Sequence, residues 1–125
     1  MRKMKKLWNG APAADDLKAA SAYLSLLASM STTKRMVAAL RRASTESAVA
    51  KDLLRASKLP LLPREDTHVE EDLKRIHKHK PLSPVLLVRG DLASGTPLVI
   101  ADGYHRICAI CYFDEDAPVA CRIVR

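Results

Sequence analysis

The sequence predicts an α+β protein in which an N-terminal three-helix part packs on a small mixed sheet. Three observations predict this class. The chain has 125 residues, a usual length for one domain. Apolar residues make up 48% of it, which is enough for a core. Apolar positions follow helical spacing through the first half, whereas the last third holds short continuous apolar runs typical of buried strands.

The first half predicts an arm followed by helices. Residues 1–12 show no apolar period and contain Gly10 and Pro12, so we expect a mobile basic arm. Residues 13–58 form the helical part. Asp15 and Asp16 open its first helix, where the helix dipole favours acidic side chains. The three helices are expected at about 15–28, 33–43 and 46–57.

The composition changes at Lys58, and residues 59–125 predict the part that contains the sheet. Two prolines within 59–63 favour a short edge strand or an extended segment. A helix is expected from Asp66 or Thr67 to about Lys78, with acids early and bases late. Strands are expected at 84–88, 98–101 and 119–124, and a helix at 105–112. We expect both parts to form one folding unit.

Positive charge is concentrated in the first half. Residues 1–58 hold 12 basic and 4 acidic residues, whereas residues 59–125 hold 9 and 10. Such asymmetry favours a polyanionic partner, although a solvated face that aids solubility is the alternative. In the second helix, Lys34 shares a face with Arg41, and Arg35 shares one with Arg42, because seven residues make nearly two turns. These four side chains are candidates for contacts with nucleic-acid phosphates.

Several classes of protein are unlikely from composition. Five aromatic residues are too few for a base-stacking surface. The chain has no apolar run long enough to span a membrane, and no apolar stretch follows its basic start, so we expect neither a membrane partner nor a secretory signal. Three cysteines cannot all pair within the chain, which favours a reducing cytoplasm.

The strongest candidate site is the segment from Asp102 to Arg106, between a buried strand and a buried helix. The first amides of a helix have no partner within it, and together with the dipole they attract anions. Gly103 lets a ligand approach the backbone, Arg106 is suited to holding a phosphate bidentately, and His105 donates or titrates near neutral pH. The segment therefore predicts a phosphate site.

Asp102 needs a separate explanation, since a carboxylate beside a phosphate is repulsive. It must cap the helix, accept a hydroxyl proton or hold a divalent metal ion. The alternative to a site is an ordinary helix start, with Asp102 as the N-cap and His105 and Arg106 on the surface. The spacing of other residues predicts no metal site in the protein itself.

The run ADGYHRICA at 101–109, after two apolar strands and before a charged loop and a strand, resembles the ParB/sulfiredoxin superfamily. The resemblance covers about residues 59–125. It implies the fold of that superfamily and a nucleotide site, with Gly103, Tyr104, His105 and Arg106 against the phosphates. It carries Asp102 over to a kinase-like branch with an Asp-Gly-His box. It also implies that His68, otherwise a solvated histidine, reaches the same cleft.

The resemblance also has departures. Tyr104 stands where sulfiredoxins have their catalytic cysteine, so we do not expect sulfiredoxin activity. In ParB proteins a DNA-binding helix-turn-helix follows this domain, whereas here the extra helices precede it, so a partition role is not expected either.

We therefore expect a ParB-like protein that binds a nucleotide or another phosphorylated small molecule. The implied cofactor is a nucleoside triphosphate with Mg²⁺, and Asp102 is the candidate catalytic residue of a phosphotransferase or hydrolase. One alternative is a nucleic-acid-binding accessory protein that uses the basic helices. The other is a non-catalytic protein that binds a partner.

Overall fold

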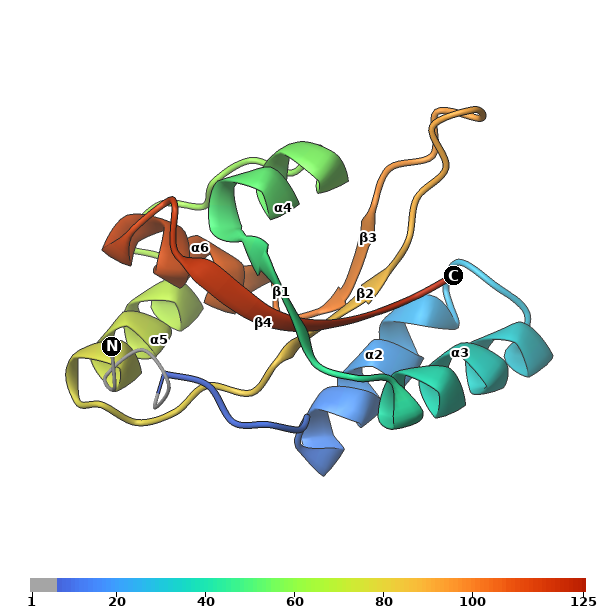
Figure 1. Cartoon of the computed structure of the whole chain (residues 1–125), viewed down its shortest axis with the longest axis horizontal. Coiled ribbons are helices and arrows are strands. Elements are labelled where there is room, and N and C mark those ends of the chain that lie inside the picture. The colour runs from blue at the N-terminus through green and yellow to red at the C-terminus, as the bar shows by residue number, and fades with distance from the viewer. Residues whose placement is uncertain (1–6) are drawn as a thin grey trace.

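The computed structural model describes residues 7–125, which form an α+β fold of five helices and one four-stranded mixed sheet (Figure 1). In chain order the elements are α2 (Ala14–Leu24), α3 (Met30–Arg42), β1 (Glu46–Val49), α4 (Ala50–Ser57), α5 (Thr67–His77), β2 (Val85–Val88), β3 (Val99–Asp102), α6 (Tyr104–Phe113) and β4 (Pro118–Val124). No helix among these residues is long and apolar enough to cross a bilayer.

The sheet has the order β1-β4-β2-β3. Strands β2 and β4 run parallel, whereas β1 pairs with β4 and β3 pairs with β2 in the antiparallel sense. Strand β2 is central and buried along its whole length, as its continuous apolar run predicts. A strand buried on both faces needs cover on both sides, and this requirement sets the layers of the fold.

Helices cover the two faces of the sheet separately (Figure 1). Val85 and Leu87 of β2 belong to a core shared with α4, α5 and α6. The alternate residues, Leu86 and Val88, belong to a second core shared with α2 and α3. This alternation follows from the two-residue period of a strand. The helical hairpin α2–α3 and the remaining helices thus sandwich the sheet.

The predicted third helix at 46–57 is wrong over its first four residues. Glu46–Val49 forms the edge strand β1, because it pairs with residues 118–121 of β4. Only Ala50–Ser57 is helical. The pairing partner lies about 70 residues away, so local apolar spacing carries no signal of it. The N-terminal part is therefore a two-helix hairpin plus a strand of the common sheet.

Other boundaries differ by smaller amounts. Helix α2 ends at Leu24, and α3 begins at Met30 because the Ser29 hydroxyl caps it by accepting from the Thr32 amide. The segment 59–63 forms neither a strand nor a helix. Two tyrosines of α6 hold it in place: the Tyr104 hydroxyl donates to the Pro60 carbonyl and that of Tyr112 to the Leu62 carbonyl. Helices α5 and α6 and the strands β2, β3 and β4 confirm their predicted positions to within one or two residues.

The predicted mobile arm at 1–12 is wrong for its second half. Leu7 is buried in the core, and the chain runs beside Leu82. The Leu82 amide donates to the Leu7 carbonyl at 2.8 Å, and the Asn9 amide donates to the Leu82 carbonyl at 2.7 Å. Burial of Leu7 explains the difference, because it anchors the segment. Residues 1–6 lie outside the described part of the chain.

Arg122 of β4 fixes the end of α3. Its guanidinium donates to the carbonyl oxygens of Leu40 and Arg41, which are among those left without partners at a helix C-terminus. It also donates to the Thr45 hydroxyl and the Gly10 carbonyl. One side chain thereby joins the last strand, the hairpin and the N-terminal segment.

Substitution of Leu87 by Ala tests the double-sided burial of β2. The side chain is fully buried, so we expect a loss of about 2–5 kcal/mol in the free energy of unfolding, measured by urea titration. Leu92→Ala is the matched control, because Leu92 is fully exposed in the β2–β3 loop, and we expect a change within about 0.5 kcal/mol. Equal losses in the two variants would contradict the placement of β2.

Candidate functional site

The start of α6 is shaped by a glycine. Gly103 follows the end of β3 with a φ of 111° and holds the N-cap position of α6 without a side-chain cap. A Cβ at this position would lie 2.5 Å from Cγ1 of Val85, so no larger residue fits. Asp102 therefore does not cap the helix, contrary to the simplest alternative from sequence. The first amides of α6 are left without a side-chain acceptor.

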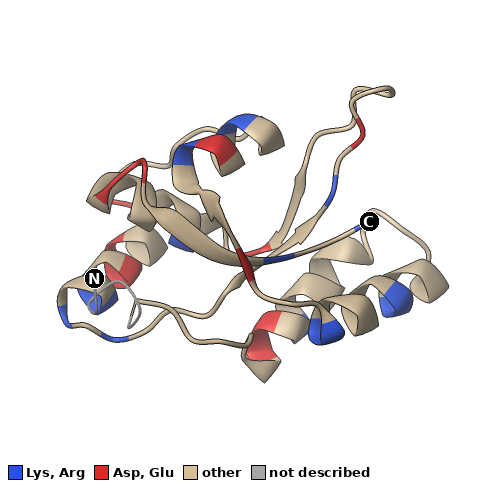
Figure 2. Ribbon diagram, in the orientation of Figure 1, with Lys and Arg blue, Asp and Glu red and all other residues tan. Residues whose placement is uncertain are grey.

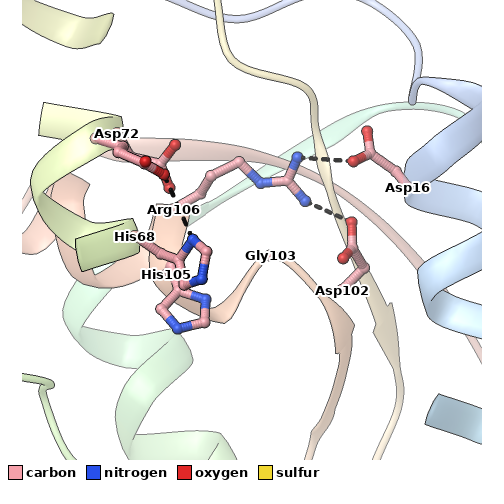
Figure 3. Close-up of a pocket in the computed structure, with 8 residues that line it drawn as sticks. Asp16, His68, Asp72, Asp102, Gly103, His105 and Arg106 are labelled. Atoms are coloured by element: carbon pink, nitrogen blue, oxygen red, sulfur yellow. Dashed lines mark hydrogen bonds and ion pairs between the residues drawn. The ribbon is translucent and has the colours of Figure 1, made fainter. Parts of the chain in front are cut away.

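A cavity of about 270 Å³ lies in front of this helix start (Figure 3). Five of the residues predicted from sequence line it. Its lining residues are Asp16, His68, Glu71, Asp72, Asp102, Gly103, His105 and Arg106. The structure thus brings α2, α5, β3 and α6 together around one pocket.

Arg106 forms two ion pairs on one side of the pocket. Its Nη1 lies 3.2 Å from Oδ1 of Asp16, and its Nη2 lies 2.7 Å from Oδ2 of Asp102. All three side chains are largely buried, and that of Arg106 is 12% exposed. Both terminal nitrogens of the guanidinium are therefore paired with carboxylates. The role of Arg106 as a phosphate ligand stays a prediction. The structure adds a second role, in which Arg106 holds Asp16 of α2 beside Asp102 of β3.

The two carboxyl groups bound to Arg106 differ in acidity. Burial, together with the smaller effect of the neighbouring Asp16, raises the pKa of Asp102 to about 6 despite the charge of Arg106. Burial also tends to raise the pKa of Asp16. The hydrogen bond from the Ala13 amide and the charge of Arg106 outweigh this effect, so the pKa of Asp16 is lowered. Two nearby carboxyl groups whose pKa values are driven apart are typical of acid–base sites.

Two imidazoles line the other side of the pocket. His68 in the first turn of α5 and His105 in the first turn of α6 have ring centroids 4.9 Å apart. Figure 3 shows the two rings next to each other. Nδ1 of His68 lies 3.4 Å from Glu71, and Nε2 of His105 lies 3.9 Å from Asp66. Asp66 caps α5 by accepting from two of its amides. The N-termini of α5 and α6 therefore lie next to each other at these two imidazoles.

Tyr104 lies apart from the pocket. Its hydroxyl is bound to the carbonyl of Pro60, and its side chain is not among those that line the cavity. Only its backbone amide belongs to the helix start, so no side-chain contact to a ligand follows from this geometry.

Sequence reasoning missed three acidic lining residues. Asp16 is explained locally as a first-turn acid of α2, and its carboxylate does accept from the Ala13 amide. Glu71 and Asp72 likewise match the acidic start of α5. Burial raises the pKa of Asp72, and Arg106 and His105 offset this only in part. The spacing between these segments gives no signal of their meeting.

The four basic residues predicted to contact nucleic acid lie on α3, away from this pocket. Lys34, Arg35, Arg41 and Arg42 are all exposed. They belong to a separate surface of the molecule and contribute nothing to the chemistry around His105.

The described residues contain no group of three or more metal-ligating side chains placed to hold a metal ion. This arrangement fits a Mg²⁺ ion that arrives bound to a nucleotide. Such an ion needs only one or two carboxylates of the protein, because the phosphates of the nucleotide supply other ligands. The pocket can thus offer amides and imidazoles to an anion and carboxylates to its counter-ion.

The raised pKa of Asp102 predicts a pH-dependent cost of folding. The folded protein keeps this proton up to about pH 6, whereas the unfolded chain loses it near the ordinary value of 3.8. The contribution of Asp102 to the free energy of unfolding is therefore fully present below about pH 4. It falls by roughly 1–3 kcal/mol as the pH rises to about 6. Asp16 acts in the opposite sense, since its lowered pKa gives stability that is lost only in more acidic solution.

Asp102→Asn removes this titration. Urea titrations at about pH 4.5 and pH 7 are expected to show the variant gaining stability relative to the unsubstituted protein at the higher pH. The same difference between the two proteins at both pH values would contradict the burial of an ionisable Asp102.

The chain matches no protein-family model, no curated protein and no solved structure.

Proposed function

We propose that this protein binds a phosphate-bearing small molecule, most specifically a nucleoside triphosphate with Mg²⁺, in the pocket at the start of α6. One observation carries the proposal. The cavity of about 270 Å³ lies at the uncapped start of α6, where it is lined by Gly103 and by the adjacent imidazoles of His105 and His68. Helix amides and imidazoles together are donors suited to a phosphate group.

The carboxylates explain why the ligand needs a cation. Asp16, Glu71, Asp72 and Asp102 line the same pocket, and only Arg106 balances them permanently. A bare polyphosphate would be repelled by these groups. A nucleotide that carries Mg²⁺ presents a positive ion to the carboxylates and phosphate oxygens to the amides and imidazoles.

Asp102 is the candidate catalytic base. Its pKa of about 6 leaves it ionised at neutral pH yet close enough to that pH to accept a proton. Arg106 holds one of its oxygens at 2.7 Å and so orients the other. In this role Asp102 would take the proton from a hydroxyl or water whose oxygen bonds to the terminal phosphorus. The bond from that phosphorus to the bridging oxygen breaks, and the nucleoside diphosphate leaves, as in a phosphotransferase or hydrolase.

The sequence resemblance supports the same ligand. The run at 101–109 is similar to the phosphate-binding box of the ParB/sulfiredoxin superfamily, and here Gly103 and His105 of that run line the cavity. Arg106 is the exception, because its part in the proposed function is to position Asp102 and Asp16.

A thermal-shift titration with nucleoside triphosphates, with and without Mg²⁺, tests the binding. A ligand at about 100 times its Kd stabilises the folded state by roughly 2.7 kcal/mol, which raises Tm by several degrees. We expect this rise only with Mg²⁺, and its loss in His105→Gln. His77→Gln is the matched control, since His77 is exposed at the far end of α5 and does not line the pocket.

An unchanged Tm with every triphosphate would refute nucleotide binding. A rise that survives in the double variant His68→Gln/His105→Gln would show that the ligand binds elsewhere. Arg106→Ala is unsuitable for this test, because it leaves the buried Asp16 and Asp102 without their cation and destabilises the fold itself.

A further inference from the structure

The hairpin α2–α3 carries an open groove on its outer side. The sequence predicts three helices here, but α4 packs on the opposite face of the sheet, so no third helix within residues 7–125 covers the hairpin. A cavity of about 410 Å³ lies between the two helices. Its lining residues are Ala14, Leu17, Lys18, Ser21, Val37 and Arg41. Leu17 and Val37 are only partly buried, so apolar surface remains uncovered.

The groove lies in a strongly basic part of the chain. Residues 17–45 contain no Asp or Glu, and they hold five basic residues. Figure 2 shows blue on α3 and red only at the beginning of the hairpin. Lys18 of α2 and Arg41 of α3 line the groove from its two opposite sides. The apolar floor is thus bordered by a cation on each helix.

The loop that joins the helices is unusually apolar for an exposed turn. Leu26 is 79% exposed, Leu27 58% and Met30 69%. Single surface leucines are ordinary, but three large exposed side chains within five residues concentrate apolar surface at the turn of the hairpin. The groove residues lie toward the other end of the two helices.

We propose that this groove binds an acidic amphipathic helix of a partner protein. A cleft between two helices accepts a third, because ridges of side chains fit between those of its neighbours. The apolar floor formed by Leu17 and Val37 matches the apolar stripe of such a helix. Lys18 and Arg41 match acidic side chains on the two flanks of that stripe.

Nucleic acid fits this surface less well. A phosphate backbone is recognised by polar and charged groups, whereas Leu17 and Val37 leave the floor apolar. Arg35 and Arg42 are rotated by about 100° around α3 from Lys34 and Arg41, so the four cations do not form one row. A lipid bilayer also fits poorly, since a concave groove cannot insert into it.

The groove is separate from the pocket at α6. Asp16 contacts Arg106 there, whereas Lys18, two residues later, is rotated by about 200° around α2. The groove can therefore be tested while the pocket residues are left unchanged.

The test uses a fluorescent peptide of about 15 residues, the length needed to lie along α3. It carries Leu at helical spacing, Glu on both flanks and Ala on the back, and its binding to the full chain is measured by anisotropy at low salt. A peptide of the same design with Lys in place of Glu is the control for charge. Duplex DNA and anionic vesicles are measured beside them.

Two double variants separate the groove from general charge. Lys18→Glu/Arg41→Glu reverses the cations of the groove, and we expect at least about a tenfold loss of affinity for the acidic peptide. Arg35→Glu/Arg42→Glu changes the net charge equally but lies outside the groove, and we expect less than about a threefold loss. All these residues are exposed, and circular dichroism checks that both variants fold.

Several results would overturn the proposal. These are no binding of the acidic peptide at low salt, equal losses in the two double variants, or stronger binding of the Lys peptide. A preference for duplex DNA that both double variants abolish would assign the hairpin to nucleic acid instead. A preference for anionic vesicles would assign it to a membrane surface.

Discussion

The pairing of one guanidinium with two carboxylates organises the pocket. Arg106 of α6 contacts Asp16 from α2 and Asp102 from β3, so it joins the layers on the two faces of the sheet beside the pocket at the start of α6. Removing Arg106 leaves two largely buried carboxyl groups without their cation, which is costly in a protein interior. The geometry of the helix start thus depends on an ion pair formed by residues 90 positions apart.

This pairing also divides the pocket electrostatically. Because Arg106 is neutralised, the donors that remain for an anion are the α6 amides and the imidazoles of His68 and His105. The carboxylates face the same space and favour a cation. A divided pocket of this kind suits the proposed ligand, in which the positive charge of Mg²⁺ lies next to the negative charge of the phosphates.

Local signals predicted most of the fold. The continuous apolar run of β2 predicted a doubly buried strand, and α5 carries its Asp66 cap, its acidic start and its basic end. Strand β1 was not predictable, because its stability comes from pairing with a strand that follows some 70 residues later. Leu7 was missed for a related reason, since its burial depends on Leu82 and not on its own neighbours.

The candidate site likewise combines residues with a local signal and residues brought in by the fold. Gly103 and His105 are found from a short motif, whereas Asp16 satisfies a local role and reveals its contact with Arg106 only in three dimensions.

The edge strand has a practical consequence for anyone dividing the chain. The change of composition at Lys58 invites expression of residues 59–125 as a minimal domain. Such a fragment would lack β1 and leave the outer edge of β4 with unpaired amides and carbonyls. It would also lose α2 and α3, uncovering Leu86 and Val88. An open edge beside bare apolar surface promotes self-association, so the shortened protein would aggregate where the whole chain folds.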